Sequence, residues 1–298
     1  MRRTVLLRVP RKRMMLTLFA ALMAFGVASV VTFVASLTNT PAASAQTIRN
    51  PDHSYFIARC DFSHRSYDDP IVYPGQQGAA HRHDFFGNKS TNYQSTYNKL
   101  LAANTTCLRS GDKSAYWIPT VKWNGQTLKA DRGLFYYGAG NKDPTKVKAP
   151  PAGLKVVADT HATWRCQTDA AFTEVPPTQC PDGQLNVHID FPDCSDGRRD
   201  SADHRKHMAY SVRPSDGGPN QCPDAHPTPV PMLTVSIRFP LPTTAGTVTL
   251  SSGAASTMHS DFFNAWSQET LERLVMNCIN EYSPTTREWP TQCQQPLN

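Results

Sequence analysis

The sequence is poor in charge and above all in glutamate. Only 18% of the 298 residues are charged. Beyond position 45 there are five glutamates, all at or after Glu174, so a glycosidase carboxylate pair would have to use mainly aspartate. The sequence also has no G-x-S-x-G, no H-E-x-x-H and no G-x-x-x-x-G-K. These absences argue against α/β-hydrolases, zincin proteases and P-loop nucleotide-binding proteins.

Acidic residues are missing altogether from the first 45 positions, which carry all of the excess positive charge. Subtracting the six basic residues of this segment from the 30 Lys+Arg leaves 24, against 24 Asp+Glu in residues 46–298. The remainder of the chain is therefore balanced, and composition gives no support for a nucleic-acid partner.

The N-terminal segment has the layout of an export signal. An apolar run over residues 14–37 follows the basic positions and is followed by Ala43-Ser44-Ala45, a small-residue cleavage pattern. We therefore predict that residues 1–45 are a signal peptide and residues 46–298 a single exported domain. The alternative is an uncleaved membrane anchor, since 24 apolar residues are long enough to span a bilayer of about 30 Å. A membrane partner is expected only in that case.

All eight cysteines lie beyond the leader, and no C-x-x-C pair is present. An even number of cysteines in an exported chain predicts four disulfides and argues against cysteinyl zinc. Eight cysteines allow 105 pairings, so only local pairs are predicted. These are Cys278 with Cys293 and Cys60 with Cys107.

Short alternating segments separated by Pro and Gly dominate the exported part. The clearest are residues 233–239 and 185–191, in which apolar and polar residues alternate as in a half-buried strand. Further strands are expected at 116–123, 134–137, 154–158 and 247–250. Helices are expected at 93–102 and 261–280, the second capped by Ser260 or Asp261. The pattern predicts a mainly β domain, a sandwich or jelly roll, braced by disulfides, with a few helices including one near the C-terminus.

Histidines gather with aspartates in a few short groups: His81-Arg82-His83-Asp84, Asp203 to His207, His188-x-Asp190 and His259-Ser260-Asp261. On an extended backbone, residues i and i+2 point to the same face, so such a pair offers two ligands or two acid–base groups. Imidazole with carboxylate suits Zn²⁺ or Mn²⁺, and neutral histidine is also a common general base. The competing interpretation is that these groups only brace loops.

The ordered succession DPIVYPG, HRHDFFGN, YWIP, HIDFPDCSDG, DHRKHMAYS, CPDAHPTPVP and HSDFFNAW resembles a family of secreted domains of unknown function. That family occurs in actinobacterial and fungal exported proteins, in some fungal members beside WSC-type carbohydrate-binding modules. The similarity runs from about Cys60 to Cys278. It implies an extracellular role and points to cell-wall or other polysaccharide as the partner.

The motifs of this resemblance supply the predicted site. The histidines match as H-x-H-x-F-x-G, H-x-x-Y and H-x-D-F, and the catalytic candidates are His81, His83, His207, Tyr210, His259 and Asp261. We expect the histidines and Asp261 to converge. If a divalent metal such as Zn²⁺ or Mn²⁺ is held, the predicted ligands are His81, His83 and His207.

Two functions remain open at this stage. The first is a polysaccharide lyase or hydrolase in which a histidine takes a proton, Tyr210 donates one, and Arg82 or Lys206 offsets a uronate carboxylate. Trp117 would join a sugar-stacking face, although such aromatic residues are more often part of the core. The second is a non-catalytic module that binds glycan or cell wall, with structural histidines.

Overall fold

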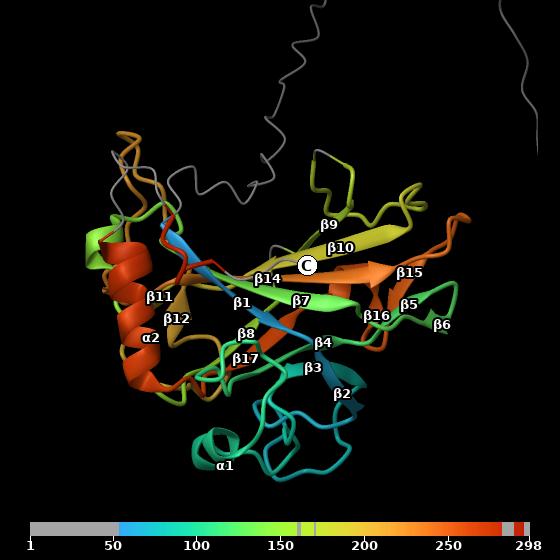
Figure 1. Cartoon of the computed structure of the whole chain (residues 1–298), viewed down its shortest axis with the longest axis horizontal. Helices are drawn as coiled ribbons and strands as arrows, with labels where there is room; N and C mark the ends of the chain where they lie inside the picture. Colours follow the sequence, from blue (N-terminus) through green and yellow to red (C-terminus); the bar gives the residue numbers. More distant parts are fainter. Residues whose placement is uncertain (1–53, 160–161, 170, 282–288, 295–298) are drawn as a thin grey trace, which may run out of the picture. The chain divides into compact units, whose positions relative to one another are not determined.

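The computed structural model describes residues 54–159, 162–169, 171–281 and 289–294 (Figure 1). All of them belong to one compact unit of the chain. The predicted signal peptide or anchor, residues 1–45, lies outside the described residues. Among the helices that are described, none is long and apolar enough to cross a membrane.

Five antiparallel strands form the first large sheet, which we call sheet A. In spatial order they are β1 (Tyr55–Cys60), β7 (Arg132–Gly138), β14 (Met232–Pro240), β10 (Gln184–Asp190) and β9 (Ala162–Cys166). The two clearest alternating segments of the sequence are neighbours in it, since Val187 of β10 pairs with Ile237 of β14. Their apolar faces therefore lie on the same side, as the alternation requires.

A second five-stranded antiparallel sheet, sheet B, carries most of the histidine motifs. Its spatial order is β2 (Phe62–Ser66), β3 (His83–Gly87), β4 (Ala115–Pro119), β17 (Ser260–Phe263) and β8 (Lys155–Ala158). Segments from opposite ends of the sequence thus become adjacent strands. For example, Phe262 of β17 pairs with Tyr116 of β4.

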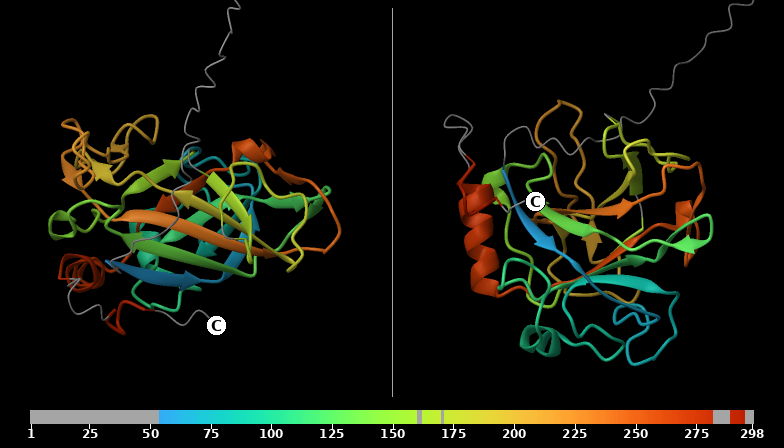
Figure 2. Two further views of the ribbon diagram at one scale, coloured as in Figure 1. Left: turned by 90° about the horizontal axis from the view of Figure 1, so that it is seen from above. Right: turned by 45° about the vertical axis from the view of Figure 1, so that its right-hand side comes forward.

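The two sheets pack face to face through aromatic side chains (Figures 1 and 2). Tyr116 of sheet B stacks on Phe135 of sheet A with ring centroids 3.8 Å apart. Phe262 contacts the ring of Tyr137 at 6.3 Å. These contacts form the main hydrophobic core, and they confirm the prediction of a mainly β domain with sandwich packing.

The remaining elements are short. A small three-stranded antiparallel sheet consists of β12 (Met208–Ala209), β11 (Cys194–Ser195) and β13 (Thr228–Pro229). A small four-stranded antiparallel sheet consists of β16 (Gly253–Ala254), β15 (Val248–Leu250), β5 (Val121–Trp123) and β6 (Gln126–Thr127). The helical elements are α1 (Tyr97–Ala102), η1 (Pro144–Lys146), η2 (Ala255–Thr257), α2 (Gln268–Val275) and the π-helical turn η3 (Met276–Asn280).

The predicted start of the C-terminal helix was wrong. Asp261 does not cap a helix but lies in β17, and α2 begins only at Gln268. The error has a physical cause: Phe262 points into the main core, whereas Phe263 belongs to a second core on the opposite face of sheet B. A strand buried on both faces has no polar alternation, so its apolar run resembles part of a buried helix.

The second core covers the face of sheet B that points away from sheet A, which we call the outer face. It includes Phe85 and Trp117 from the sheet, Leu100 from α1 and Ile71 from the segment between β2 and β3. In Figure 1 this segment and α1 lie below sheet B. The outer face is thus roofed by a loop and a short helix, and the histidine motifs lie beneath this roof.

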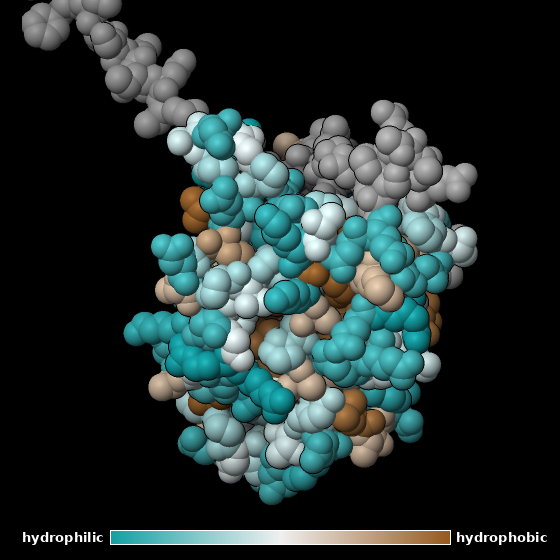
Figure 3. Space-filling model, turned by 90° about the vertical axis from the view of Figure 1, so that its left-hand side faces the viewer, coloured by the Kyte–Doolittle hydropathy of each residue, from teal (hydrophilic) through white to brown (hydrophobic). Residues whose placement is uncertain are grey.

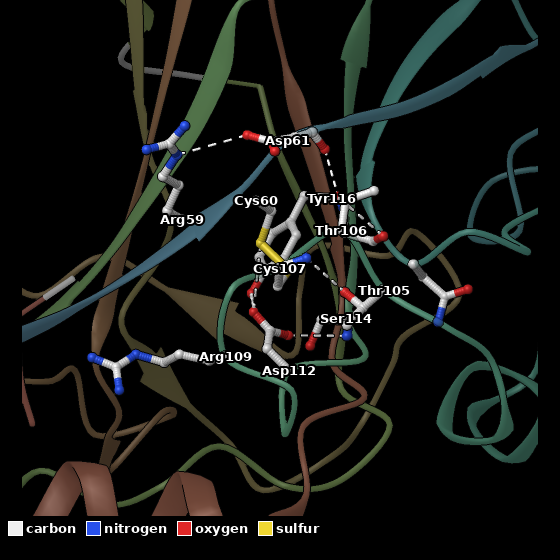
Figure 4. The surroundings of a disulfide bond; sticks show 12 residues. Arg59, Cys60, Asp61, Thr105, Thr106, Cys107, Arg109, Asp112, Ser114 and Tyr116 are labelled. Atoms are coloured by element: carbon white, nitrogen blue, oxygen red, sulfur yellow. Dashed lines mark hydrogen bonds and ion pairs between the residues drawn. A yellow bond between two sulfur atoms is a disulfide. The ribbon is translucent and has the colours of Figure 1, made fainter. Parts of the chain in front are cut away.

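Four disulfides brace the domain, and none of the cysteines is free. Both predicted pairs, Cys60–Cys107 and Cys278–Cys293, are confirmed, and the other two are Cys166–Cys180 and Cys194–Cys222. Four disulfides are typical of extracellular proteins. The Cys60–Cys107 bond joins the end of β1 to the segment that leads into β4 (Figure 4).

Candidate functional site

Strand register brings Trp117 and Asp261 side by side on the outer face. Phe85, Trp117, Asp261 and Val157 are paired directly across β3, β4, β17 and β8. Residues paired across neighbouring strands point to the same face of a sheet. Asp261 therefore projects into the second core, where an ionised carboxylate has no water to solvate it.

The adjacent row on the same face contains the histidines. His83 pairs with Pro119. When the β4–β17 register is continued by two residues, His259 lies beside Pro119. When the β17–β8 register is continued by one residue, Asp159 lies beside His259. Pro119 therefore lies between His83 and His259 in this row. The centroids of the His83 and His259 rings are 5.9 Å apart.

His81 joins this pair from the segment that leads into β3. Its ring centroid is 4.3 Å from that of His83 and 5.1 Å from that of His259. The H-x-H and H-x-D motifs, separated by more than 170 positions in the sequence, thus form a single group. We call His81, His83, His259, Asp261 and Asp69 the His/Asp cluster.

Asp69 enters the cluster from the roofing loop. Its Oδ1 accepts hydrogen bonds from the backbone N–H groups of Ile71 (2.8 Å) and Val72 (2.9 Å), which fix the carboxyl group in a turn. The Trp117 indole N–H faces this carboxyl and favours its charged form, although the two groups do not meet standard hydrogen-bond geometry. The carboxyl group of Asp69 is thus held by the turn within reach of His83 and Asp261 of sheet B.

Two of the imidazoles have a defined tautomer. Nδ1 of His83 lies 3.1 Å from the carbonyl oxygen of Asp68, and Nδ1 of His259 lies 2.9 Å from that of Thr257. A carbonyl oxygen can only accept, so each Nδ1 must carry the proton. In the neutral ring, each Nε2 then has an unprotonated lone pair, the form in which histidine binds a metal or accepts a proton.

Several buried polar atoms of the cluster have no hydrogen-bond partner among the described residues. They include Nε2 of His81, Nε2 of His83 and both carboxylate oxygens of Asp261, a residue that is only 1% exposed. His259 Nε2 approaches Asp261 Oδ2 at 3.8 Å, too far for a hydrogen bond. Buried polar groups are nearly always paired, so this concentration marks a functional position.

Burial shifts every pKa in the cluster toward the neutral form. Desolvation, with a smaller contribution from His259, lowers the pKa of His81 to about 4. Desolvation also lowers the pKa of His83 and of His259. The pKa of Asp261 is raised well above its usual value by desolvation and by the neighbouring Asp69, whose own pKa is raised by desolvation. The imidazoles are therefore neutral at pH 7 and available as bases or ligands.

The potential ligand atoms fall into two overlapping sets. One ligand atom from each of His81, His83 and His259 lies within 4.8 Å of the others, and the same holds for Asp69, His83 and Asp261. A third set of this kind, Cys60, Cys107 and Asp112, is of a different nature. Its cysteines form a disulfide and have no thiolate to offer a metal.

His207 lies apart from these sets. Its Nε2 donates to the carbonyl oxygen of Lys155 (2.6 Å) and its Nδ1 is hydrogen-bonded to the Ser201 hydroxyl at 3.0 Å. Both ring nitrogens are thus engaged with neighbouring loops and strands. The ligand group around His81 and His83 is completed by His259 rather than by the predicted His207.

The other predicted residues also have structural partners. The Tyr210 hydroxyl donates to the carbonyl oxygen of Asp190. The Arg82 guanidinium donates to the Thr127 hydroxyl. Lys206 is exposed, and its Nζ lies 3.5 Å from Oδ2 of Asp203. The sugar-stacking interpretation of Trp117 is corrected. Its ring is fully buried, as is that of Trp164, and Trp123 is 3% exposed, so none of them presents a face to a sugar.

Sequence reasoning missed two features of the site. Asp69 appeared only within the segment DPIVYPG, and its position before Pro70 gave no signal of a role in the site. The ion pair of Arg205 and Asp159, 2.7 Å long and half exposed, was also missed. Asp159 lies opposite His259, and both charged groups act on the pKa of Asp261. They are therefore the charged groups at the exposed margin of the cluster.

The profile of one family, described as "Domain of unknown function (DUF1996)", matches residues 69–266, more than half of the chain. Every residue of the His/Asp cluster falls within this range. Neither the curated proteins nor the solved structures contain a match to the chain.

Proposed function

The chain belongs to this family of domains of unknown function, and we propose that it is an exported enzyme that cleaves extracellular or cell-wall polysaccharide at the His/Asp cluster. The observation that carries the proposal is the convergence of three histidines and two aspartates, of which His81, His83 and Asp261 have buried polar atoms without a hydrogen-bond partner. A purely structural cluster would instead satisfy those atoms internally, as buried polar groups normally do.

The chemistry of the cluster suits cleavage of a glycosidic bond. Hydrolysis needs a group that activates water, and β-elimination from a uronate needs a base for the C5 proton. Neutral imidazoles serve both reactions. His81 is suited to act on substrate because the residue is only partly buried, whereas His83 is fully buried.

The loop that supplies Asp69 also offers the surface that a sugar needs. Tyr67 is 55% exposed and Tyr73 is 38% exposed, and both lie within six residues of Asp69. No other aromatic side chain in the described residues is exposed to this degree. Exposed tyrosine presents an apolar ring face together with a polar hydroxyl, a combination suited to stacking on sugar rings.

Docking on a broad apolar surface has little support by comparison. The face in Figure 3 is mostly hydrophilic, with its hydrophobic residues in small scattered groups. The large apolar side chains exposed elsewhere, Leu108, Val175, Val212 and Met276, are distant from one another in sequence. Scattered apolar residues of this kind are normal on soluble domains.

Incubation with uronate, glucan and arabinan polymers tests the proposal. We expect new reducing ends, accompanied by the ultraviolet absorbance of unsaturated uronates if the reaction is an elimination. His81→Ala should abolish the release. His226→Ala is the matched control, since His226 lies on a surface loop and its ring is hydrogen-bonded to the Lys206 carbonyl oxygen.

Binding to a polymer without release of products from any of them would contradict the enzymatic proposal. That result would instead identify a non-catalytic module that binds glycan or cell wall.

A further inference from the structure

The His/Asp cluster contains two carboxyl groups and no lysine or arginine of its own. Its two carboxyl groups, Asp69 and Asp261, lie within 4.8 Å of His83 and of each other. The three imidazoles are uncharged at pH 7, and Arg205, the basic group that acts on Asp261, is already paired with Asp159. Two buried carboxylates facing each other require either a proton or a cation between them.

The directions of the lone pairs favour a cation. The proton on Nδ1 of His83 and of His259 is bound to a backbone carbonyl oxygen, so each Nε2 presents a lone pair. Metal-binding histidines typically donate their other N–H to a carbonyl or carboxylate oxygen in this way. A structural imidazole tends to use both nitrogens, as His207 does.

The separations are close to those expected around one ion. Two ligands at about 2.1 Å from a metal lie at most about 4 Å apart. Within each of the two ligand sets, the ligand atoms lie within 4.8 Å of one another, and His83 belongs to both sets. In addition, His259 Nε2 of one set lies 3.8 Å from Asp261 Oδ2 of the other. Where separations exceed this limit, the side chains would move closer together on binding the ion.

We propose that His83, His259 and Asp261 hold one divalent cation, with His81 and Asp69 completing its coordination, and that Zn²⁺ binds there more tightly than Mn²⁺. Three nitrogen and two carboxylate donors suit either metal, and Zn²⁺ binds more tightly than Mn²⁺ to most such sites. The two carboxylates balance the charge of the ion. This proposal deepens the proposed function and rests on it only for the role of the ion, which is to acidify a bound water or polarise the substrate.

Zinc binding to the full, untagged chain tests the proposal. Protein stripped with EDTA is titrated with ZnCl₂ and, separately, with MnCl₂ in a calorimeter, and bound metal is counted by elemental analysis. We expect about one Zn²⁺ per chain. Loss of a hydrogen bond to a ligand costs roughly 10- to 100-fold in metal affinity, so Asp261→Asn, which removes a ligand, should cost at least about 100-fold. His259→Gln should act similarly.

Matched controls separate the site from general effects on charge or folding. Asp224→Asn and His226→Gln change the same residue types on an exposed loop and should leave zinc affinity within about twofold. Circular dichroism and the absence of free thiols show that each variant retains its fold and its disulfides. Because Asp261 has no hydrogen bond to lose, Asp261→Asn should pass this check.

The outcomes distinguish this inference from the proposed function. Wild-type protein that binds no zinc, or that binds it as tightly after Asp261→Asn and His259→Gln, overturns the metal site. If metal-free protein still cleaves polysaccharide, the proposed function stands without the ion. Stoichiometric zinc lost in both variants, together with inactivity on every polymer, supports the metal site and contradicts the proposed function.

Discussion

Asp112 and Asp261 are both withdrawn from water, yet their surroundings differ completely. Asp112 lies under the Cys60–Cys107 disulfide and accepts hydrogen bonds from the Ser114 backbone N–H (3.0 Å) and the Tyr116 hydroxyl (2.9 Å) (Figure 4). Asp261 is buried to the same extent and accepts none. Burial of a carboxyl group therefore does not identify a functional site, whereas burial without partners does.

The difference has an energetic cost. Leaving a buried polar group unpaired costs about 1–3 kcal/mol, and more for a charged group. The protein avoids this cost at Asp112 by continuing the network from Tyr116 to the hydroxyl of Tyr137 and the indole N–H of Trp266. The carboxyl group of Asp261 has no such partners. This is expected where a bound ligand offsets the free-energy cost of burying it unpaired.

The largest expected contrast is between Asp261→Asn and Asp112→Asn. The first variant should lose at least about 100-fold in zinc affinity and nearly all polysaccharide cleavage. The second should keep both within about twofold, because its carboxyl group serves the core only. Equal losses of activity in the two variants would show that the comparison does not separate function from structure. Parallel zinc titrations and rate measurements decide this.

Chelation should destabilise the protein only through the His/Asp cluster. A ligand at a hundred times its Kd stabilises the native state by about 2.7 kcal/mol. EDTA should therefore lower the free energy of unfolding of zinc-loaded wild type by roughly that amount. Asp261→Asn should show no change in chemical denaturation with or without EDTA. An equal response of the variant would place the stabilising ion elsewhere.

The pH dependence of stability should reveal Asp112. Desolvation raises its pKa to about 7 in the folded state, against about 3.9 in an unfolded chain. Between about pH 4 and pH 7 the folded state binds more protons than the unfolded state, so stability falls as pH rises through this window. The loss is up to roughly 4 kcal/mol. Denaturation of zinc-loaded wild type and Asp112→Asn across this range should show a smaller decline in the variant.

Replacing His207 should have a smaller effect, on stability alone, and tests whether its role is structural. Its two ring hydrogen bonds hold Lys155 of β8 to the loop that contains Ser201. His207→Ala should lower the free energy of unfolding by about 1–3 kcal/mol and leave zinc stoichiometry at one. Loss of zinc from a folded His207→Ala protein would restore the ligand role predicted from sequence.

The smallest expected effect concerns the exposed margin of the cluster. Arg205 has guanidinium N–H groups beyond those that contact Asp159 and the Asp203 carbonyl oxygen, and these are available to a uronate carboxylate. Arg205→Ala should raise KM for uronate polymers about two- to fivefold without affecting neutral polymers. Lys206→Ala, the control on the neighbouring exposed residue, should have no effect. An equal rise in KM for both variants would indicate general charge attraction.

Much of the fold could be predicted because the strands of sheet A alternate apolar and polar residues in the sequence. Strand β14 alternates the apolar Leu233, Val235 and Ile237 with polar residues, and it was predicted almost to its ends, although Thr234 and Ser236 are themselves buried. Sheet B gave a weaker signal. Residues 83–87 and 115–119 are buried at every position, since the roofing loop covers what would otherwise be a polar face.

The candidate site was predictable only as far as short motifs extend. The H-x-H and H-x-D spacings placed His81 with His83 and His259 with Asp261, and the structure unites these pairs. Which pairs meet depends on the β4–β17 register, which no local pattern encodes. Asp69 was not predicted as a site residue, because an aspartate before proline is common in turns.

We propose that buried ligand atoms on the outer face of sheet B surround a metal ion. Anomalous difference maps from crystals of untagged, zinc-loaded protein, recorded on either side of the zinc absorption edge, test it most directly. We expect one strong peak within about 2.0–2.2 Å of Nε2 of His83, Nε2 of His259 and a carboxylate oxygen of Asp261. A featureless map at this position, with these side chains as placed here, would contradict it.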